Sequence, residues 1–235
     1  MQKTRFGILG ADKRMKKLQM SLASDGFAAS MLGAGSSFDE FDVLILPPAC
    51  DFEGIKDKCR GKTVFAPFCA NGVINYLEID SFKKENAVPS AEGAVYRLMG
   101  LCETTVRGME IAVIGFGCIG KELYRILTCL GAFVTVYARG GKKGTVDISA
   151  LHGIRTDCIF NTVPAKLLTF DVLSSLRGSP LIIDLASRPG GVDFGAAESL
   201  GIKCFQELAI PGRYAPDSAG EILKNTVISY LRGVK

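Results

Sequence analysis

Histidine is almost absent from this chain of 235 residues, and its one example, His152, stands in the run Ala150–Gly153. Enzymes that oxidise an alcohol with a nicotinamide commonly use an imidazole as the acid–base group. We expect His152 between a helix and the start of a strand, whereas ligands of parallel sheets bind at the other strand ends. The sequence therefore argues against a histidine-dependent alcohol oxidation.

Disulfide and metal-binding patterns are missing as well. The eight cysteines are widely spaced, no two form a Cys-x-x-Cys pair, and none lies near His152. Because most of them stand within apolar runs, we interpret them as reduced core thiols. We expect no metal site.

Long apolar stretches and a strong charge bias are also lacking. No run approaches the roughly 18 apolar residues of a membrane helix, and Met1–Gly10 has no signal-peptide pattern. The net charge of +4 is scattered, and no RNA-binding motif is present. With 48% hydrophobic residues the chain can bury a core. We predict a soluble, cytoplasmic protein that binds neither membranes nor nucleic acids.

What the sequence does contain is a strand that runs into Gly115-x-Gly117-x-x-Gly120. The first glycine permits a tight turn, the second lets the backbone approach a pyrophosphate, and the third lets a helix pack on its strand. A helical apolar pattern and a second strand, Ala132–Tyr137, complete a βαβ unit. We predict a dinucleotide site, and its loop residues are Gly115, Phe116, Gly117, Cys118, Ile119 and Gly120.

The end of the second strand indicates which dinucleotide binds. NAD sites usually carry an acidic residue there, whereas this strand is followed by Arg139, Lys142 and Lys143 with no carboxylate in reach. A guanidinium can pair with the 2′-phosphate of NADP, and the two lysines add positive charge. The alternative is a solvated basic loop. We predict NADP as the cofactor.

The glycine loop lies mid-chain, so another lobe precedes it. We predict an α/β protein with two lobes: a short flavodoxin-like or Rossmann-like lobe over residues 1–88, and a doubly wound, parallel Rossmann domain over residues 109–217. A linking helix over residues 89–108 starts with Ser90 as its N-cap. A capping box from Ser218 to Glu221 opens a last helix, residues 218–235, that can pack back on the first lobe.

Two further loops follow strands of the second lobe, where ligands of a parallel sheet bind. Polar residues after one strand, Asn161, Thr162, Val163 and Pro164, can line the ribose or nicotinamide of the cofactor. After the next strand, the loop Ser187–Asp193 can offer Arg188 and backbone N–H groups to an anionic substrate. The alternative is a surface turn in which Asp193 caps the next helix.

Four segments together resemble the A-type subunit of bacterial dipicolinate synthase: Ala87–Gly93 (AVPSAEG), Ile111–Gly120 (IAVIGFGCIG), Leu181–Phe194 (LIIDLASRPGGVDF) and Pro211–Ile222 (PGRYAPDSAGEI). The resemblance implies an NADP-dependent oxidoreductase that converts a cyclic dicarboxylate, derived from dihydrodipicolinate, to dipicolinate. It implies a flavoprotein-like partner, the B-type subunit of dipicolinate synthase, and the mother cell of a spore-forming bacterium as location.

The same resemblance implies a substrate cleft that is lined by Ser90, Glu92, Ser187 and Arg188. The implied catalytic residues among these are Glu92, Ser187 and Arg188. Arg213 is a further partner for a substrate carboxylate. The first lobe is shorter than in the family, which puts substrate contacts from Asn71 and Asn75 in doubt. Two alternatives remain: a non-catalytic NADP-binding subunit that regulates a flavoprotein, and a dehydrogenase of another small acid. The sequence leaves open whether the chain forms a homodimer.

Overall fold

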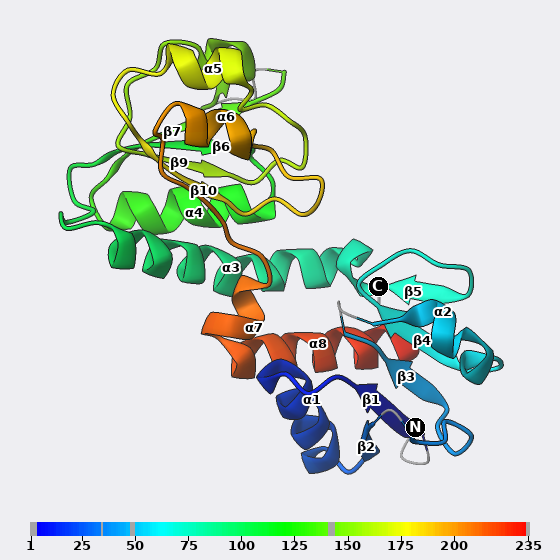
Figure 1. The fold of residues 1–235 in the computed structure, drawn as a ribbon. Helices are drawn as coiled ribbons and strands as arrows, with labels where there is room; N and C mark the ends of the chain where they lie inside the picture. The colour runs from blue at the N-terminus through cyan, green and yellow to red at the C-terminus, as the bar shows by residue number, and fades with distance from the viewer. Residues whose placement is uncertain (1–3, 34, 48–49, 141–143, 234–235) are drawn as a thin grey trace. The chain divides into compact units, whose positions relative to one another are not determined.

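The computed structural model describes residues 4–33, 35–47, 50–140 and 144–233. The chain divides into two compact units, one made of Met1–Pro89 with Pro211–Lys235 and the other of Ser90–Ile210. Each unit contains one parallel β-sheet with helices (Figure 1). The predicted fold class, α/β with two parallel-sheet lobes, is confirmed.

The first unit has a five-stranded sheet in the order β2-β1-β3-β4-β5, the strand order of flavodoxin-like folds. Strand β2 lies on one side of β1 and the later strands lie on the other, so the strand order reverses between β1 and β3. The strands are β1 (Arg5–Leu9), β2 (Ala28–Leu32), β3 (Val43–Ile45), β4 (Thr63–Ala66) and β5 (Val73–Asn75). The helices are α1 (Lys13–Ser24), α2 (Phe52–Ile55) and α8 (Pro216–Leu231), with short 3₁₀ turns at Lys56–Cys59 and Tyr76–Glu78.

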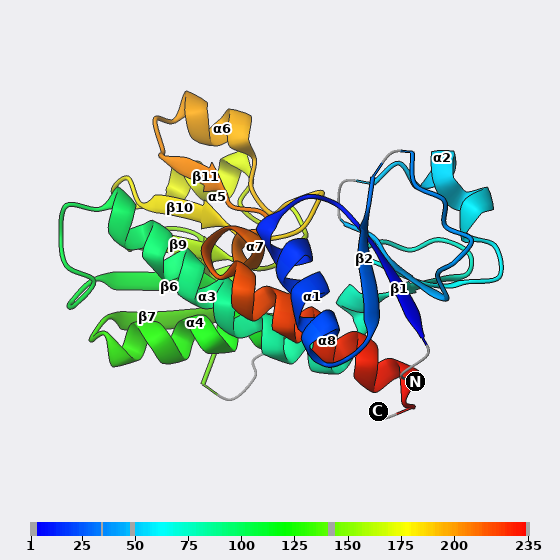
Figure 2. The ribbon, with the colours of Figure 1, turned by 90° about the horizontal axis from the view of Figure 1, so that it is seen from below.

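The core of the first unit forms where α1 and α8 cover the sheet (Figure 2). Met15, Leu18 and Leu22 recur on one face of α1, and they pack with the β1 residues Phe6 and Ile8. The side chains that α8 adds to this core are Leu223, Val227 and Ile228.

The second unit has a six-stranded sheet in the order β11-β10-β9-β6-β7-β8. Relabelled from β6 as the first strand, this is the order of dinucleotide-binding Rossmann domains, with the reversal between β6 and β9. The strands are β6 (Glu110–Ile114), β7 (Phe133–Ala138), β8 (Val146–Asp147), β9 (Cys158–Asn161), β10 (Leu181–Asp184) and β11 (Cys204–Gln206). The helices are α4 (Cys118–Cys129), α5 (Phe170–Ser175) and α6 (Phe194–Ser199), with a 3₁₀ turn at Ile148–Leu151.

The helix that precedes β6 starts earlier than the sequence predicted. Helix α3 spans Asp80–Leu101 and contains Pro89 in its interior, so the predicted start at Ser90 is wrong. The residues before Pro89 include Lys, Glu and Ala, which favour helix and continue it back to Asp80. Ser90 is therefore a buried residue of the helix interior and not the N-cap of the helix.

The last helix also begins differently from the prediction. Helix α8 starts at Pro216 after Ala215, and no side chain caps it, so the predicted capping box at Ser218 is wrong. Proline at the first turn has a backbone angle that suits a helix start and lacks the N–H that a cap would satisfy. Glu221 instead accepts a hydrogen bond from Ser21 on α1 and pairs with Lys224.

Two features that would change the class of the protein are absent from the described residues. Within this part of the chain, no helix is both long and apolar enough to span a membrane. Nor do three or more His, Cys, Asp or Glu side chains gather there in a way that could hold a metal ion. All eight cysteines are free thiols.

Candidate functional site

The glycine loop joins β6 to α4 at the reversal point of the second sheet. Gly115 has φ +100°, a backbone conformation that L side chains rarely adopt. A Cβ on Gly115 would lie 2.8 Å from Val163 Cγ2, and one on Gly120 would overlap the carbonyl oxygen of Gly115. Both positions therefore require glycine for packing inside the protein.

Gly117 differs from the other two glycines. Beyond the adjacent residues Phe116 and Cys118, no described atom lies within 4 Å of the position that a Cβ would take there, so packing does not explain the missing side chain. Gly117 is the N-cap of α4 and provides no side-chain cap, which leaves the first N–H groups of the helix for another acceptor. An open position beside a helix N-terminus fits a phosphate-bearing ligand.

The segment after β9 lies directly against this loop. The backbone N–H and the Oγ1 of Thr162 both donate to the carbonyl oxygen of Ile114, each at 2.9 Å. Thr162 and Val163 are half-buried, and Pro164 is exposed. The structure thus brings two separately predicted segments, the glycine loop and Thr162–Pro164, to one edge of the sheet.

Asn161 has a different place from the other residues of its segment. Its side chain is fully buried, and its Nδ2 donates to Asp184 Oδ1 at 2.7 Å and to the carbonyl oxygen of Val163 at 3.0 Å. Its Oδ1 accepts from the N–H of Val163. All of these contacts are within the protein, so Asn161 holds the loop that follows it.

Asp184 was not predicted as a site residue. This fully buried carboxylate ends β10, and it accepts hydrogen bonds from the backbone N–H groups of Ala186 and Gly191, each at 3.1 Å. A Cβ on Gly191 would overlap the amide of Asn161. Asp184 therefore fixes both ends of the loop after β10. The signal in the sequence is a polar residue that ends an apolar strand, as Asn161 also does.

The loop after β10 presents its charged residue outward. Ser187 and Arg188 are exposed, and Arg188 makes no ion pair with any residue that the structure describes. Asp193 accepts from the N–H of Ala196 as the cap of α6 and pairs with Lys166 at 3.2 Å. These contacts lower the pKa of Asp193. The loop thus combines the predicted cap with a guanidinium that is free to meet an anion.

The structure at the end of β7 differs from the sequence prediction that no carboxylate lies near Arg139. Arg139 is exposed there, as predicted, but the short strand β8 places Asp147 in register beside Ala138. The inference that no carboxylate is in reach is therefore wrong. Hydrogen bonds from the backbone and side chain of Ser149 lower the pKa of Asp147, and the N–H of Gly140 adds to the effect. Lys142 and Lys143 lie outside the described residues.

The other predicted residues lie elsewhere in the second unit. Glu92 is exposed on α3. The hydrogen bond and charge of Glu122 raise the pKa of Arg125 on α4, and the charge of Glu92 is the smallest contribution to this shift. His152 is exposed and follows the 3₁₀ turn that precedes β9. It therefore stands toward the amino end of β9, as expected.

A buried ion pair supports the outer edge of the same sheet. Glu207 follows β11, is 4% exposed, and accepts from Arg97 Nε at 2.6 Å. The guanidinium of Arg97 also lies over the ring of Phe205, 5.2 Å from its centroid. The N–H of Glu207 donates to the carbonyl oxygen of Asp184. The pair could not be found from the sequence because its members are 110 residues apart.

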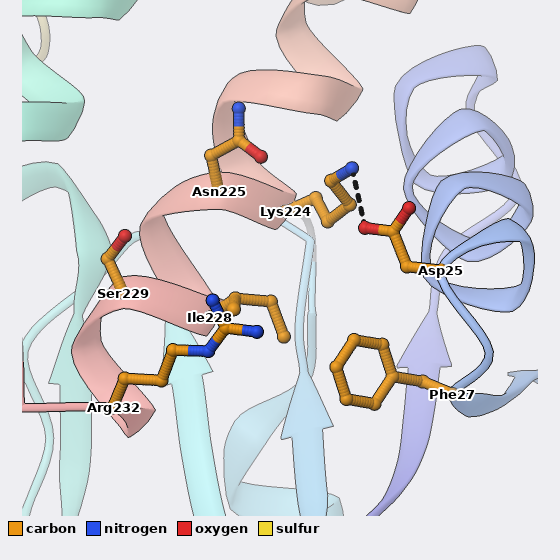
Figure 3. A pocket seen from close by; sticks show the side chains of 7 residues that line it. All are labelled: Asp25, Phe27, Lys224, Asn225, Ile228, Ser229 and Arg232. Carbon is orange, nitrogen blue, oxygen red and sulfur yellow. Dashed lines mark hydrogen bonds and ion pairs between the residues drawn. The ribbon is translucent and has the colours of Figure 1, made fainter. Parts of the chain in front are cut away.

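Two hollows lie away from these loops. One of about 780 Å³ in the second unit is lined by Met109, Asp157 and Ser179, which precede β6, β9 and β10. One of about 510 Å³ in the first unit lies between the end of α1 and α8, where Lys224 is already paired with Asp25 at 2.9 Å (Figure 3). Neither lies at the carboxyl ends of the strands, where parallel sheets bind ligands.

Comparison with known proteins identifies a curated relative. No family model matches the chain. The A-type subunit of dipicolinate synthase from Bacillus subtilis (strain 168) is 35% identical over 174 residues, which cover 69% of this chain and 59% of that protein. The chain thus spans about three fifths of the length of this relative.

Solved structures share the fold over nearly the whole chain. The crystal structure of the A-type subunit of dipicolinate synthase from Bacillus halodurans has a TM-score of 0.86 at 24% identity and covers 97% of this chain and 98% of its own. The apo structure of D-lactate dehydrogenase from Escherichia coli has a TM-score of 0.72 at 14% identity, covering 99% and 98%. The fold is therefore that of Rossmann-type dehydrogenases, and the predicted resemblance is confirmed.

Proposed function

We propose that this chain, which belongs to the family of A-type subunits of dipicolinate synthase, is an NADP-dependent oxidoreductase that acts on a cyclic dicarboxylate. Bound NADP+ would accept a hydride from a dihydrodipicolinate-derived ring, giving the aromatic dipicolinate, NADPH and a proton. The observation that carries the proposal is the open position at Gly117 beside the N-terminus of α4. We place the reaction in the cytoplasm of a sporulating mother cell.

The cofactor proposal rests on the loops at the reversal point of the second sheet. The backbone of residues 115–120 would hold the pyrophosphate, and Thr162, Val163 and Pro164 would flank the adjoining ribose. Arg139 is exposed and makes no ion pair with any described residue, so its guanidinium is available for a 2′-phosphate.

Asp147 favours NAD over NADP, because NAD sites hold the ribose 2′-OH with an acidic residue near the end of the second strand of the βαβ unit. Its carboxylate, however, already accepts from the N–H and the Oγ of Ser149, at 2.9 and 2.7 Å. Both donors bind Oδ1, so that oxygen has less capacity for a ribose hydroxyl and Oδ2 is the one that remains. We therefore propose NADP ahead of NAD.

The substrate proposal rests on the loop after β10. Arg188 offers an unpaired guanidinium among the described residues, and a ring with two carboxylates needs such a partner. Asp184 holds the loop from inside the protein, so Arg188 stands on a fixed support. The remaining members of the proposed substrate group are Ser187, which is exposed on the same loop, and Glu92.

The test replaces Arg188 with alanine and measures both turnover and NADPH binding. We expect Arg188→Ala to abolish turnover and to bind NADPH as tightly as the wild type. Arg155→Ala is the matched control. Arg155 is an exposed arginine of the same unit, and it precedes the amino end of β9, whereas Arg188 follows the carboxyl end of β10. Normal turnover by Arg188→Ala would remove the substrate assignment.

A partner is a separate part of the proposal. The relative is named as one subunit of a synthase, and we propose that a flavoprotein-like B-type subunit joins this chain. Turnover by the purified chain alone would support an independent enzyme. Turnover only after the partner is added, with NADPH binding already complete, would instead support a non-catalytic cofactor-binding role.

A further inference from the structure

A hollow in the second unit brings three arginines together at the amino ends of its strands. Its volume is about 780 Å³, which is the size of a small-ligand pocket. Three segments form it: the residues that follow α3, those that precede β9 and those that precede β10. Each segment contributes one arginine, and these are Arg107, Arg155 and Arg177. All three are exposed, so a ligand can reach them from solvent.

The three guanidiniums have no counter-charge in the described structure. None of them forms an ion pair with a described residue. Among the described residues that line the hollow, Asp157 is the one carboxylate, and its Oδ2 already accepts from the backbone N–H of Glu110 at 2.8 Å. The positive side chains of the lining thus outnumber the negative one by two. An anion with at least two charges would balance them.

Two of these arginines are held side by side by the backbone. Arg155 and Arg177 form an isolated parallel bridge, and the N–H of Arg177 donates to the carbonyl oxygen of Ile154 at 2.9 Å. Paired strands lie about 4.8 Å apart, so the two side chains start as neighbours. Like charges on directly paired residues repel each other. The fold therefore holds two cations together without supplying an anion.

Helix ends account for only part of this arrangement, although a cation near the carboxyl end of a helix is favourable. The Cγ of Arg107 lies 3.1 Å from the position that a Cβ on Gly131, just after α4, would take. Arg177 follows the C-cap of α5. Arg155, however, follows a 3₁₀ turn and not an α-helix. Helix ends therefore explain neither Arg155 nor its pairing with Arg177.

Hydroxyl groups line the same hollow and indicate the kind of anion. They belong to Thr104, Thr105 and Ser179, and all three residues are exposed. A carboxylate has two oxygens, which a single guanidinium fork can satisfy. A phosphate group has three strong acceptor oxygens, so it can accept from guanidinium and hydroxyl donors together. The mixture of donors therefore suits phosphate groups better than carboxylates.

We propose that this hollow binds an anion with two linked phosphate groups, of which inorganic diphosphate is the simplest. The bridged pair Arg155 and Arg177 would hold one phosphate group, and Arg107 would hold the other. The hollow lies at the amino ends of the strands, whereas the proposed cofactor and substrate loops follow the carboxyl ends. The site is therefore independent of the proposed reaction.

Calorimetric titration with sodium diphosphate tests the site in the full chain, without nucleotide. At about 0.15 M salt, weak attraction between distant surface charges is screened. The wild type and Gly117→Val are both titrated, because the valine fills the open position at the glycine loop and keeps diphosphate from binding there. We expect saturable binding to both proteins, with the same affinity for the hollow.

Three arginine variants, each made in both proteins, locate the bound diphosphate. Arg107→Gln and Arg177→Gln should each lower the affinity at least about 5-fold, because each removes a charge-assisted contact. Glutamine keeps most of the stem, so packing is little changed. Arg125→Gln is the matched control, since Arg125 is exposed in the same unit and pairs with Glu122 away from the hollow. It should bind diphosphate as its parent protein does.

Malonate and inorganic phosphate test the class of ligand. Each should bind at least about 5-fold more weakly than diphosphate, because neither offers two linked phosphate groups. Binding that is lost in Gly117→Val would place diphosphate at the glycine loop and overturn the proposal. Tighter binding of malonate, unchanged affinity in Arg177→Gln and Arg107→Gln, or no saturable binding up to about 5 mM diphosphate would overturn it as well.

Discussion

Asn161 Nδ2 donates a hydrogen bond to Asp184 Oδ1 at 2.7 Å, and both side chains are fully buried. The two residues face each other in register at the ends of β9 and β10. Through this contact the loops after two neighbouring strands are held as one support. The proposed cofactor and substrate loops therefore depend on each other.

Asp184→Asn should lower both stability and turnover. An asparagine offers one acceptor oxygen where the carboxylate has two, so at least one buried N–H loses its partner, at about 1–3 kcal/mol. We expect a lower free energy of unfolding by urea titration. Asp171→Asn, an exposed change in the same unit, is the control. Equal stability of the two variants would mean that the buried network is not needed.

Gly120→Ala should destabilise the second unit, since its Cβ would overlap the carbonyl oxygen of Gly115. Overpacking of this kind costs about 1–3 kcal/mol, which lowers Tm by several degrees. Gly117→Ala faces open space and loses only the N-cap preference for glycine, so it should unfold closer to the wild-type temperature than Gly120→Ala does. Calorimetry of the two variants checks the difference, and a stable Gly120→Ala would contradict the close helix–strand contact.

Arg139→Ala should weaken NADPH binding by about 10-fold or more and leave NADH binding nearly unchanged, because only NADPH carries the 2′-phosphate. Fluorescence titration with each dinucleotide measures both affinities. Equal losses for the two cofactors would remove the 2′-phosphate assignment, and Asp147 would then become the better candidate for ribose recognition.

Stability should fall in alkaline solution because of Cys204. Burial, and then the charge of Asp184, raises the pKa of this thiol from 9.0 to about 12. Between these values the unfolded chain loses the proton and the folded chain keeps it, so the free energy of unfolding decreases as pH rises.

Cys204→Ala should therefore show a smaller fall in Tm than the wild type between about pH 8 and pH 10.5. Each kcal/mol corresponds to about 2–4 °C in a protein of this size. Cys129→Ala, which removes an exposed thiol, should follow the wild-type curve. Parallel curves for all three proteins would show that Cys204 does not contribute.

Local patterns in the sequence predicted the strand–helix–strand unit around the glycine loop, and its elements are confirmed. Strand β7 differs from the predicted run Ala132–Tyr137 by one residue at each end. Their apolar runs and the helical spacing between them are properties of neighbouring residues, which a sequence displays directly.

Features that depend on strand register were missed. Strand β8 has two exposed residues and no pattern of its own, so the carboxylate of Asp147 beside Ala138 could not be foreseen. Arg97 and Glu207 meet only because α3 and the end of β11 are brought together by folding. The sequence does not show where α3 starts, because a proline usually marks a helix boundary, whereas Pro89 lies inside this helix.

Direct titration of the chain with NADPH is the measurement that bears most closely on the central claim. We predict that the wild type binds NADPH with higher affinity than NADH. Gly117→Val fills the open position without an internal clash, and we expect it to weaken binding at least about 10-fold, with only the small fall in Tm that the loss of an N-cap glycine causes. Wild-type affinity in Gly117→Val, or no binding of either dinucleotide by the wild type, would contradict the account.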